Sequence, residues 1–551
     1  MNLLALACLE AAVFFNANLH TGAEPVAGAD AILVQDARIS FIGPTEEARR
    51  RAPEGAHFVD LAGATVVPGF TDAHAHLAGI GLREMAFDLD GTASLAELQA
   101  RLAARAASSP DDWITGRGWI ESRWEPARFP TRAALDAVVA DRPVLLERAD
   151  GHAAVANSRA LALAGIDAST PDPAGGRILR DAHGEPTGML IDAATRLVER
   201  LVPPPSEADA LRALELGAAR SVRLGWTQLQ DAGTDLAGIT RLCRLYDEGR
   251  VKLRLYSAIG GPGSDADALL AGRIARHPCG ERLTVRAIKL YMDGALGSRG
   301  AALLAPYSDA RDSTGLLLNT ETQLLPILEQ ALRSGLQIET HAIGDRGNRM
   351  VLDLYERAFD AVPVAERSLA EPRWRIEHAQ VLDRADLPRF SALGVIASMQ
   401  PSHAISDLYF APARLGAQRL AGAYAWQSLL ASGAIVAAGS DAPVERGDPV
   451  QEFYAAVVRR SPEGYAGEDW HREQRVTREQ ALRMLTLAPA QAAFEERERG
   501  TLEVGKLADF TVLSQDLLAV PDEAILATRV LMTVIGGEIA YRADLTAVTT
   551  E

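Results

Sequence analysis

The chain has few cysteines and no long apolar run, and both absences restrict what it can be. Its 551 residues include three cysteines, Cys8, Cys243 and Cys279. They are odd in number, lie far apart and form no Cys-x-x-Cys pair, so the spacing indicates neither a disulfide framework nor a zinc knuckle. We expect them to be reduced and structural. No stretch of about 18 apolar residues occurs, so no transmembrane helix is expected.

Basic residues are outnumbered by acidic ones. Lys and Arg total 56 against 73 Asp and Glu, a formal net charge of -17. Nucleic acids and anionic membranes bind basic surfaces, so both partners are disfavoured and a small-molecule substrate is expected, with a homodimer left open. The apolar start, Met1 to Leu9, has no basic residue and is cut short by Glu10, so a secretory signal has weak support. We expect a cytoplasmic protein, with an exported form from another start codon as the alternative.

The two ends of the chain contain short strand candidates. Near the start these are 12–16, 31–35, 38–42 and 57–60. Near the end a candidate at 509–513 precedes a hairpin over 531–541, closed by Gly536-Gly537. Neither end has enough strands for a stable sheet of its own. We therefore predict one small composite β-sandwich domain built from residues 1–66 and 496–551.

Between the ends, strands alternate with helical stretches. After Gly344, for example, Val351, Leu354, Tyr355 and Ala358 recur at helical spacing. Eight βα repeats with near-continuous apolar strands predict an α/β fold, a (β/α)₈ TIM barrel over 67–495. A gap of about 80–225 is too long for one connection, so we expect an insertion with its own helices and strands over the barrel mouth. The eight strand candidates are 66–74, 227–232, 252–259, 285–293, 337–341, 373–378, 395–400 and 435–441.

Metal-binding residue types recur at the predicted ends of these strands. His74 and His76 end the first strand two positions apart, and alternate residues of a strand point to the same face. A lone His-x-His pair is more often an ordinary surface or core pair. Its weight here comes from His341, His378 and Asp441, which end the fifth, sixth and eighth strands. Because chemistry in such a barrel lies at the C-terminal ends of the strands, these residues are candidates for one site.

Lys289 lies in the inward row of the fourth strand, where a lysine is costly unless it is paired or chemically altered. One alternative is that it pairs with Asp293 or reaches outward. The other is that its neutral amine takes up CO₂ to form a carbamate, an anionic oxygen ligand able to bridge two metals. The four histidines and Asp441 on neighbouring strands favour the carbamate.

These motifs together resemble the amidohydrolase superfamily. The chain is similar in particular to the amidohydrolase-3, YtcJ-like branch, which contains N-substituted formamide deformylases, and the similarity spans nearly the whole chain. One departure is Ala154-Val155-Ala156, where an aromatic residue often precedes the Asn, and it concerns the pocket wall. The motifs that carry the resemblance are Pro68-Gly69-Phe70-Thr71-Asp72-Ala73-His74-Ala75-His76, Ala149-Asp150-Gly151-His152-Ala153-Ala154, Asn157-Ser158-Arg159-Ala160-Leu161, Asp293-Gly294-Ala295-Leu296-Gly297-Ser298-Arg299, the His341 and His378 segments, Gly439-Ser440-Asp441-Ala442-Pro443-Val444 and Gly505-Lys506-Leu507-Ala508-Asp509-Phe510.

The resemblance implies a site for two divalent metals. His74, His76 and Asp441 would bind the more buried metal, His341 and His378 the second, and the carbamate of Lys289 (a carboxylysine) would bridge them. Zinc is the first expectation for nitrogen and oxygen ligands, with iron, manganese or cobalt as alternatives. A hydroxide bridging the metals would attack a carbonyl carbon, with Asp441 as general base and then acid.

Residues near the ligands are candidates for support and for substrate contacts. Asp72, Glu339 and Glu377 are close enough in sequence to hold the imidazoles. His152 would contact substrate by the family motif, or be satisfied within its own loop. Trp119 would line an apolar pocket or pack in a core, and Arg299 would hold a substrate carbonyl or carboxylate, or pair with an acidic loop. Gln400 and His403 follow the seventh strand and are predicted to face the mouth.

We therefore expect a metal-dependent hydrolase of carbon–nitrogen bonds other than peptide bonds. An N-substituted formamide or small N-acyl amine is the leading substrate class, and a carbamate, cyclic amide or ester on the same site is the alternative. A deaminase with one metal is disfavoured by Lys289. A non-catalytic ligand-binding or regulatory protein would be expected to have lost a metal ligand, and none is lost.

Overall fold

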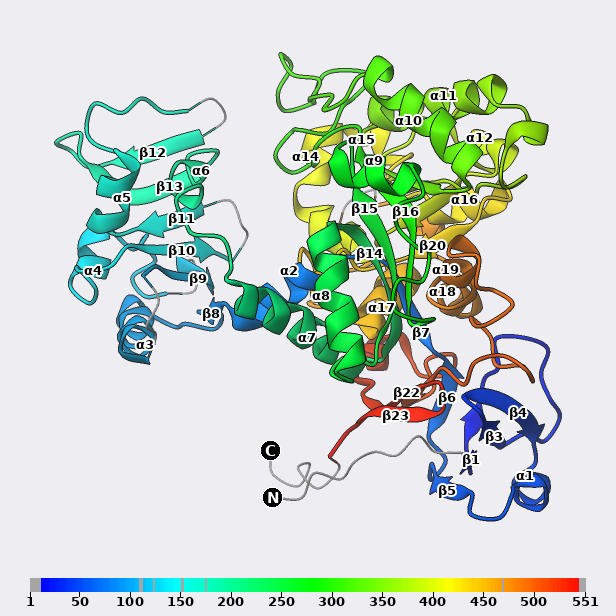
Figure 1. Cartoon of the computed structure of the whole chain (residues 1–551). Coiled ribbons are helices and arrows are strands. Elements are labelled where there is room, and N and C mark those ends of the chain that lie inside the picture. The colour runs from blue at the N-terminus through cyan, green and yellow to red at the C-terminus, as the bar shows by residue number, and fades with distance from the viewer. Residues whose placement is uncertain are drawn as a thin grey trace. The chain divides into compact units, whose positions relative to one another are not determined.

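The computed structural model describes residues 11–108, 112–121, 124–149, 153–173, 176–467 and 470–544, without the side chain at 192 (Figure 1). The chain forms two compact units. One consists of the chain up to Gly81 together with the chain from Leu211 onward, and the other is Leu82–Ala210. No helix in the described ranges is long and apolar enough to cross a membrane.

The larger unit contains an eight-stranded parallel barrel, which confirms the predicted fold class. All eight predicted strands are present, and each pairs in parallel with its neighbour in the order β7-β14-β15-β16-β17-β18-β19-β20. At the seam, the N–H of Asp441 donates to the carbonyl of His74 at 2.7 Å. The barrel strands are β7 (Phe70–Ala75), β14 (Trp226–Thr234), β15 (Arg254–Gly260), β16 (Leu283–Tyr291), β17 (Gln337–Ala342), β18 (Arg375–His378), β19 (Ile396–Met399) and β20 (Val436–Ala438).

Amphipathic helices accompany the strands and bury their apolar faces. In α11 (Asp345–Ala361), Val351, Leu354, Tyr355 and Ala358 are all buried, as their spacing predicted. The other main helices of this unit are α2 (Leu77–Met85), α7 (Glu207–Arg223), α8 (Leu236–Asp247), α9 (Ser264–Leu270), α10 (Glu321–Ser334), α12 (Leu387–Leu393), α16 (Trp426–Ala431), α17 (Pro449–Val458), α18 (Arg478–Met484) and α19 (Leu487–Ala492).

One predicted strand, 66–74, is two strands that belong to different sheets. β6 (Thr65–Pro68) pairs with β21 (Phe510–Leu513), whereas β7 pairs with β14 in the barrel. Gly69 makes the crossing: its N–H donates to Asp509 O at 3.0 Å, and a Cβ placed on it would lie 2.3 Å from Oγ1 of Thr227. Glycine is therefore required by close packing at the point where the chain enters the barrel.

Both ends of the chain form one β-domain, as predicted. A four-stranded sheet, β4-β3-β1-β5, faces a five-stranded sheet, β2-β6-β21-β22-β23, in which the last three strands come from the C-terminal end. Phe14 and Phe510 meet edge-to-face in its core, with ring centroids 4.9 Å apart. The elements are β1 (Ala11–Phe15), β2 (Asn18–Leu19), β3 (Ala31–Gln35), β4 (Arg38–Gly43), α1 (Thr45–Arg51), β5 (His57–Asp60), β22 (Val530–Ile535) and β23 (Glu538–Arg542).

The smaller unit, Leu82–Ala210, has a core of its own around a mixed six-stranded sheet ordered β12-β13-β11-β10-β9-β8. It is shorter than the expected insertion of about 80–225, because Leu211, Leu214, Ala218 and Val222 of α7 belong to the hydrophobic cluster of the barrel. Its elements are β8 (Phe87–Asp88), α3 (Leu95–Ser108), β9 (Ile114–Trp119), α4 (Arg132–Asp136), β10 (Val144–Arg148), β11 (Ala153–Ala156), α5 (Ser158–Ala164), β12 (Gly176–Arg180), β13 (Pro186–Asp192) and α6 (Arg196–Glu199).

The expectation of reduced cysteines was wrong for two of the three. Cys243 on α8 and Cys279, just before β16, form a disulfide with Cα atoms 5.3 Å apart, although 36 positions separate them in sequence. Both pack against the barrel cluster, and this packing brings them together. A separation in sequence carries no information on that contact. Cys8 lies outside the described residues.

Candidate metal centre

The six predicted metal ligands lie at the C-terminal ends of five barrel strands. The donor atoms of His74, His76 and Asp441 lie within 4.8 Å of one another. Nε2 of His76 is 3.2 Å and Nε2 of His74 is 3.5 Å from Oδ1 of Asp441. His74 belongs to β7 and His76 directly follows it, while Lys289, His341 and His378 lie on β16, β17 and β18, and Asp441 follows β20.

The remaining predicted ligands lie against this group. The ring centroid of His378 is 4.5 Å from that of His341 and 4.8 Å from that of His74. Nζ of Lys289 is 3.4 Å from Nε2 of His74. The tertiary structure therefore gathers all six side chains into one cluster, although their metal-binding roles stay predictions.

Lys289 is the chemically unusual member of the cluster. It is 1% exposed, and burial lowers the pKa of its amine, which favours the neutral form that can react with CO₂. Asp293, the alternative partner, instead accepts hydrogen bonds from three backbone N–H groups, those of Ala302, Ile343 and Gly344. The sequence has only three lysines, and arginine supplies the rest of its 56 basic residues. A lysine at this position is therefore consistent with a chemical requirement that arginine cannot meet.

The histidines are held ready to donate electron pairs. Burial is the largest cause that lowers the pKa of His74 to about 4 and that of His341 to about 3, so both rings are neutral near pH 7. Nε2 of His341 is buried and has no hydrogen-bond partner among the described residues, and the same holds for Nε2 of His403. An unpaired buried nitrogen is costly, and a divalent cation would satisfy it. The donor set therefore fits a metal.

The backbone at two of these residues adopts a conformation that non-glycine residues seldom take. His378 has φ +73° and Asp441 has φ +56°, in the left-handed region that costs non-glycine residues ~1–3 kcal/mol. Just before Asp441, a Cβ on Gly439 would lie 2.4 Å from the backbone N of His74. The strained turns and the missing Cβ together let β20 deliver Asp441 to the histidines of β7.

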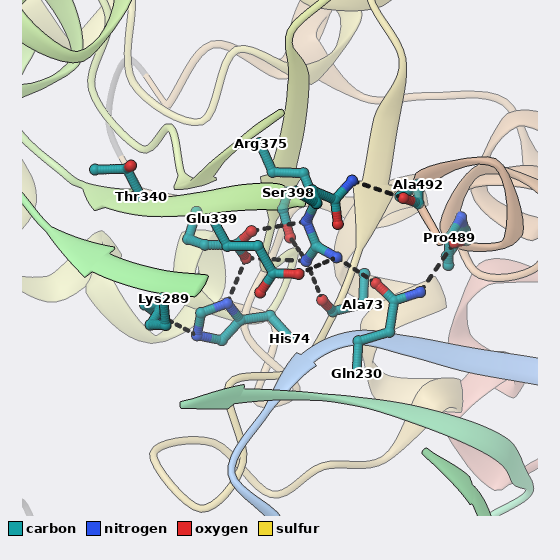
Figure 2. A network of polar contacts seen from close by, with 12 residues as sticks. Ala73, His74, Gln230, Lys289, Glu339, Thr340, Arg375, Ser398, Pro489 and Ala492 are labelled. Atoms are coloured by element: carbon teal, nitrogen blue, oxygen red, sulfur yellow. Dashed lines mark hydrogen bonds and ion pairs between the residues drawn. The ribbon is translucent and has the colours of Figure 1, made fainter. Parts of the chain in front are cut away.

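A buried ionic network supports His74 from inside the barrel (Figure 2). Nδ1 of His74 is hydrogen-bonded to Oε2 of Glu377, and Nε of Arg375 donates to Oε1 of Glu377 at 2.8 Å. Arg375 is fully buried and also donates to Gln230, to the carbonyl of Ala73 and to Ser398. Burial raises the pKa of Glu377, but the charge of Arg375 and the contact with His74 lower it by a larger amount, so the net shift is downward. Glu377 therefore stays ionised and orients the ring of His74.

Asp72 and Glu339, the other predicted support residues, do not contact the histidine rings. Asp72 accepts hydrogen bonds from the N–H of Ser440 at 2.8 Å, from its hydroxyl at 2.5 Å and from the N–H of His74 at 3.2 Å, and so joins β7 to β20. Glu339 pairs with Arg375 at 3.2 Å. Sequence reasoning missed Arg375, although its place two residues before Glu377, between the apolar Trp374 and Ile376, indicated an inward-facing charge.

Two of the five predicted substrate residues lie beside the metal ligands. Oε1 of Gln400 is 2.8 Å from Nδ1 of His378, so Gln400 orients that ring. Nε2 of His403 is 3.6 Å from Oδ2 of Asp441, and His403, His378 and Asp441 form a second group of donor atoms able to hold a cation. His403 is therefore a candidate ligand as well as a candidate substrate contact.

Trp119 and Arg299, two of the other predicted substrate residues, have their described partners within their own compact units. Trp119 is buried in the core of the smaller unit, where its indole N–H donates to Leu146 O at 2.9 Å. Arg299 pairs with Asp309 at 3.0 Å, the salt-bridge alternative recognised from the sequence. His152 lies outside the described residues. Their contacts with substrate stay predictions.

Comparison with known proteins agrees with the fold. Residues 57–541 match the model of the Amidohydrolase family, and the chain therefore belongs to that family. It is 27% identical, with a TM-score of 0.77, to the crystal structure of a metal-dependent hydrolase from Pyrococcus horikoshii OT3, over 93% of this chain and 99% of that one. The family and this structural match define the class: the chain is a metal-dependent hydrolase.

Two proteins of similar sequence match almost the whole chain. The amidohydrolase YtcJ of Bacillus subtilis (strain 168) is 32% identical over 544 residues, which are 96% of this chain and 99% of that protein. The N-substituted formamide deformylase of Arthrobacter pascens is 30% identical over 542 residues, 96% of this chain and 98% of that protein. The predicted resemblance to the YtcJ-like branch is thus confirmed.

Proposed function

We propose that this protein hydrolyses a carbon–nitrogen bond other than a peptide bond, in an amide of the formamide or small N-acyl amine type. The observation that carries the proposal is the cluster of four imidazoles, Asp441 and the buried amine of Lys289 at one end of the barrel. The substrate class is supported by the name of the Arthrobacter pascens relative. A carbamate, cyclic amide or ester would fit the same chemistry.

The residues fit two divalent cations, with zinc as the first choice for nitrogen and oxygen donors and iron, manganese or cobalt as alternatives. His74, His76 and Asp441 would hold one ion, His341 and His378 the other, and a carbamate on Lys289 would lie between them. When bound, such ions lower the pKa of water and polarise a carbonyl oxygen.

Asp441 has the position expected of the group that moves the proton. Burial raises the pKa of Asp441, but the hydrogen bond from His76 and the electrostatic field of the neighbouring imidazoles bring it to well below its ordinary value. Its carboxylate is therefore ionised and can accept a proton from the attacking water. The same oxygen can then return the proton to the departing nitrogen, which must leave as a neutral amine. Nε2 of His403 lies 3.6 Å from Oδ2 of Asp441, on the other side of the carboxylate from the contact with His76 through Oδ1.

The test combines metal content with turnover. Protein purified without chelators and with bicarbonate should contain close to two metals per chain, and it should release formate or another acid from a panel of formamides and N-acyl amines. Asp441→Asn should abolish that release. About one metal per chain together with ammonia release from amino-purines or amino-pyrimidines would favour a deaminase instead. No metal after reconstitution and no turnover would favour a ligand-binding protein, and wild-type turnover by Asp441→Asn would remove Asp441 from the mechanism.

A further inference from the structure

A cavity of about 530 Å³ lies at the N-terminal ends of β14, β15 and β16, opposite the end that carries the metal centre. Its walls come from the barrel interior, from residues 493–499 and from the β-domain. In barrels of this kind the N-terminal end usually contributes stability alone. The side chains that line this cavity include several arginines, which is unusual for a structural core: Arg38, Arg254, Arg276, Arg286 and Arg499.

Arg286 is a buried arginine in the lining of this cavity. It is 6% exposed, and its guanidinium lies 3.6 Å from the ring centroid of Phe494. It has no hydrogen-bond or ion-pair partner among the described residues. Its Nε is inaccessible to water and has no acceptor, which is costly because that group has lost water and gained no partner. Burial accordingly lowers the pKa of Arg286.

Arg499, which also lines the cavity, likewise has donors without an acceptor. It is 2% exposed, and its Nη2 donates to Thr71 and Thr227 at 2.8 Å and 3.0 Å. Its Nε and Nη1, however, have no hydrogen-bond partner in the described structure, and Nη1 is 3.8 Å from Glu495. Two buried arginines that line one cavity therefore have side-chain donors without an acceptor in the described structure.

The acidic residues that line the cavity do not pair with Arg286. Glu495 accepts a hydrogen bond from Gln228 at 2.8 Å, and Glu498 pairs with Arg38 at 2.8 Å. Asp36 and Glu281 are exposed at the rim. Among the arginines that line the cavity, Arg286 thus has no hydrogen bond or ion pair in the described structure, and Arg499 is partly paired.

We infer that this cavity is a binding site for a small oxyanion, a carboxylate or a phosphate, separate from the metal centre. Such a group supplies several acceptor oxygens and a negative charge, which match the unpaired guanidinium of Arg286 and the positive charge of the other lining arginines, and the planar guanidinium is suited to oxyanion geometry. The cavity has the size of ordinary small-molecule sites, so the anion belongs to a small molecule. The inference is independent of which bond the metal centre hydrolyses.

The test measures anion binding by the metal-loaded protein with isothermal titration calorimetry. Inorganic phosphate and acetate are titrated separately at constant ionic strength, with chloride as the reference anion, so that the two arms distinguish a phosphate site from a carboxylate site. Three proteins are compared: wild type, Arg286→Met and the control Arg282→Met. Arg282 lies on the same part of the chain outside this cavity, 3.6 Å from Glu538. Anion binding at the metal centre would be common to all three and cancels in the comparison.

The expected result is that wild type and Arg282→Met bind one of the two anions equally, while Arg286→Met binds it at least tenfold more weakly, about 1.4 kcal/mol. Equal affinity in all three proteins, or no binding by wild type, would overturn the inference. If Arg286→Met does not fold, Arg276→Glu replaces it, because Arg276 is exposed at the rim and tolerates substitution. That change should weaken binding several-fold by repulsion, and unchanged binding would count against the site.

Discussion

Replacing Glu377 by glutamine isolates the contribution of a single buried carboxylate to the metal centre. Glu377 is fully buried, and both its oxygens are used: Oε1 accepts from Nε of Arg375 at 2.8 Å, and Oε2 accepts from Nη2 of Arg375 at 3.1 Å and contacts Nδ1 of His74. Glutamine has the same shape and one acceptor oxygen. It can serve Arg375 or His74, so one of these two donors loses its acceptor in Glu377→Gln.

The size of the effect follows from that lost contact. A group that orients a metal-binding histidine contributes 10–100-fold to metal affinity, which corresponds to about 1.4–2.8 kcal/mol. We expect Glu377→Gln to weaken metal binding at the site that includes His74 by this factor, measured by competition with a chromophoric chelator near pH 7.5. The result should appear as weaker binding of a metal by a folded protein, because the change removes no side-chain volume.

The matched control for Glu377→Gln is Asp509→Asn. Asp509 is also a buried carboxylate paired with an arginine, 2.8 Å from Nε of Arg254, but it has no contact with the metal ligands. We expect this control to lower the thermal unfolding temperature and to leave metal affinity within about twofold of wild type, since it breaks a comparable pair away from the site. If Glu377→Gln also stays within about twofold, the reasoning that links Arg375, Glu377 and His74 is refuted.

Three further changes test other parts of the structure. Gly439→Ala places a Cβ 2.4 Å from the backbone N of His74, so it should displace the ligands and lower metal content; full metal loading would contradict the close packing of β20 on β7. Lys289→Ala and Lys289→Arg should both lose metal and turnover, because neither can form a carbamate, and a short carboxylic acid should partly restore the alanine variant; a fully loaded, active variant would rule out the bridging role. Phe14→Ala should destabilise the β-domain by about 3–5 kcal/mol, against about 0.5 kcal/mol or less for the 47% exposed Phe58→Ala, and equal unfolding temperatures would show that the two ends share no core.

Much of the fold could be predicted because its signals are local. The eight barrel strands are recognisable as apolar runs, and the helix over Val351–Ala358 by its spacing, since burial imposes these periods on the sequence. The division of 66–74 into β6 and β7 could not be seen, because it depends on the close approach of Thr227 to Gly69. The disulfide between Cys243 and Cys279 depends in the same way on packing between distant segments.

The sequence by itself determined the barrel, the composite β-domain and the residue types of the metal centre, because strand ends, apolar periods and His, Lys and Asp positions are properties of the chain. Only the tertiary structure decided which charged residues support the site. In the structure, His74 is hydrogen-bonded to Glu377 and His378 to Gln400, and Asp72 joins β7 to β20 through Ser440. The tertiary structure also left the guanidinium of Arg286 unpaired in a cavity at the other end of the barrel. These pairings depend on distances between strands far apart in sequence, and the order of residues alone does not contain those distances.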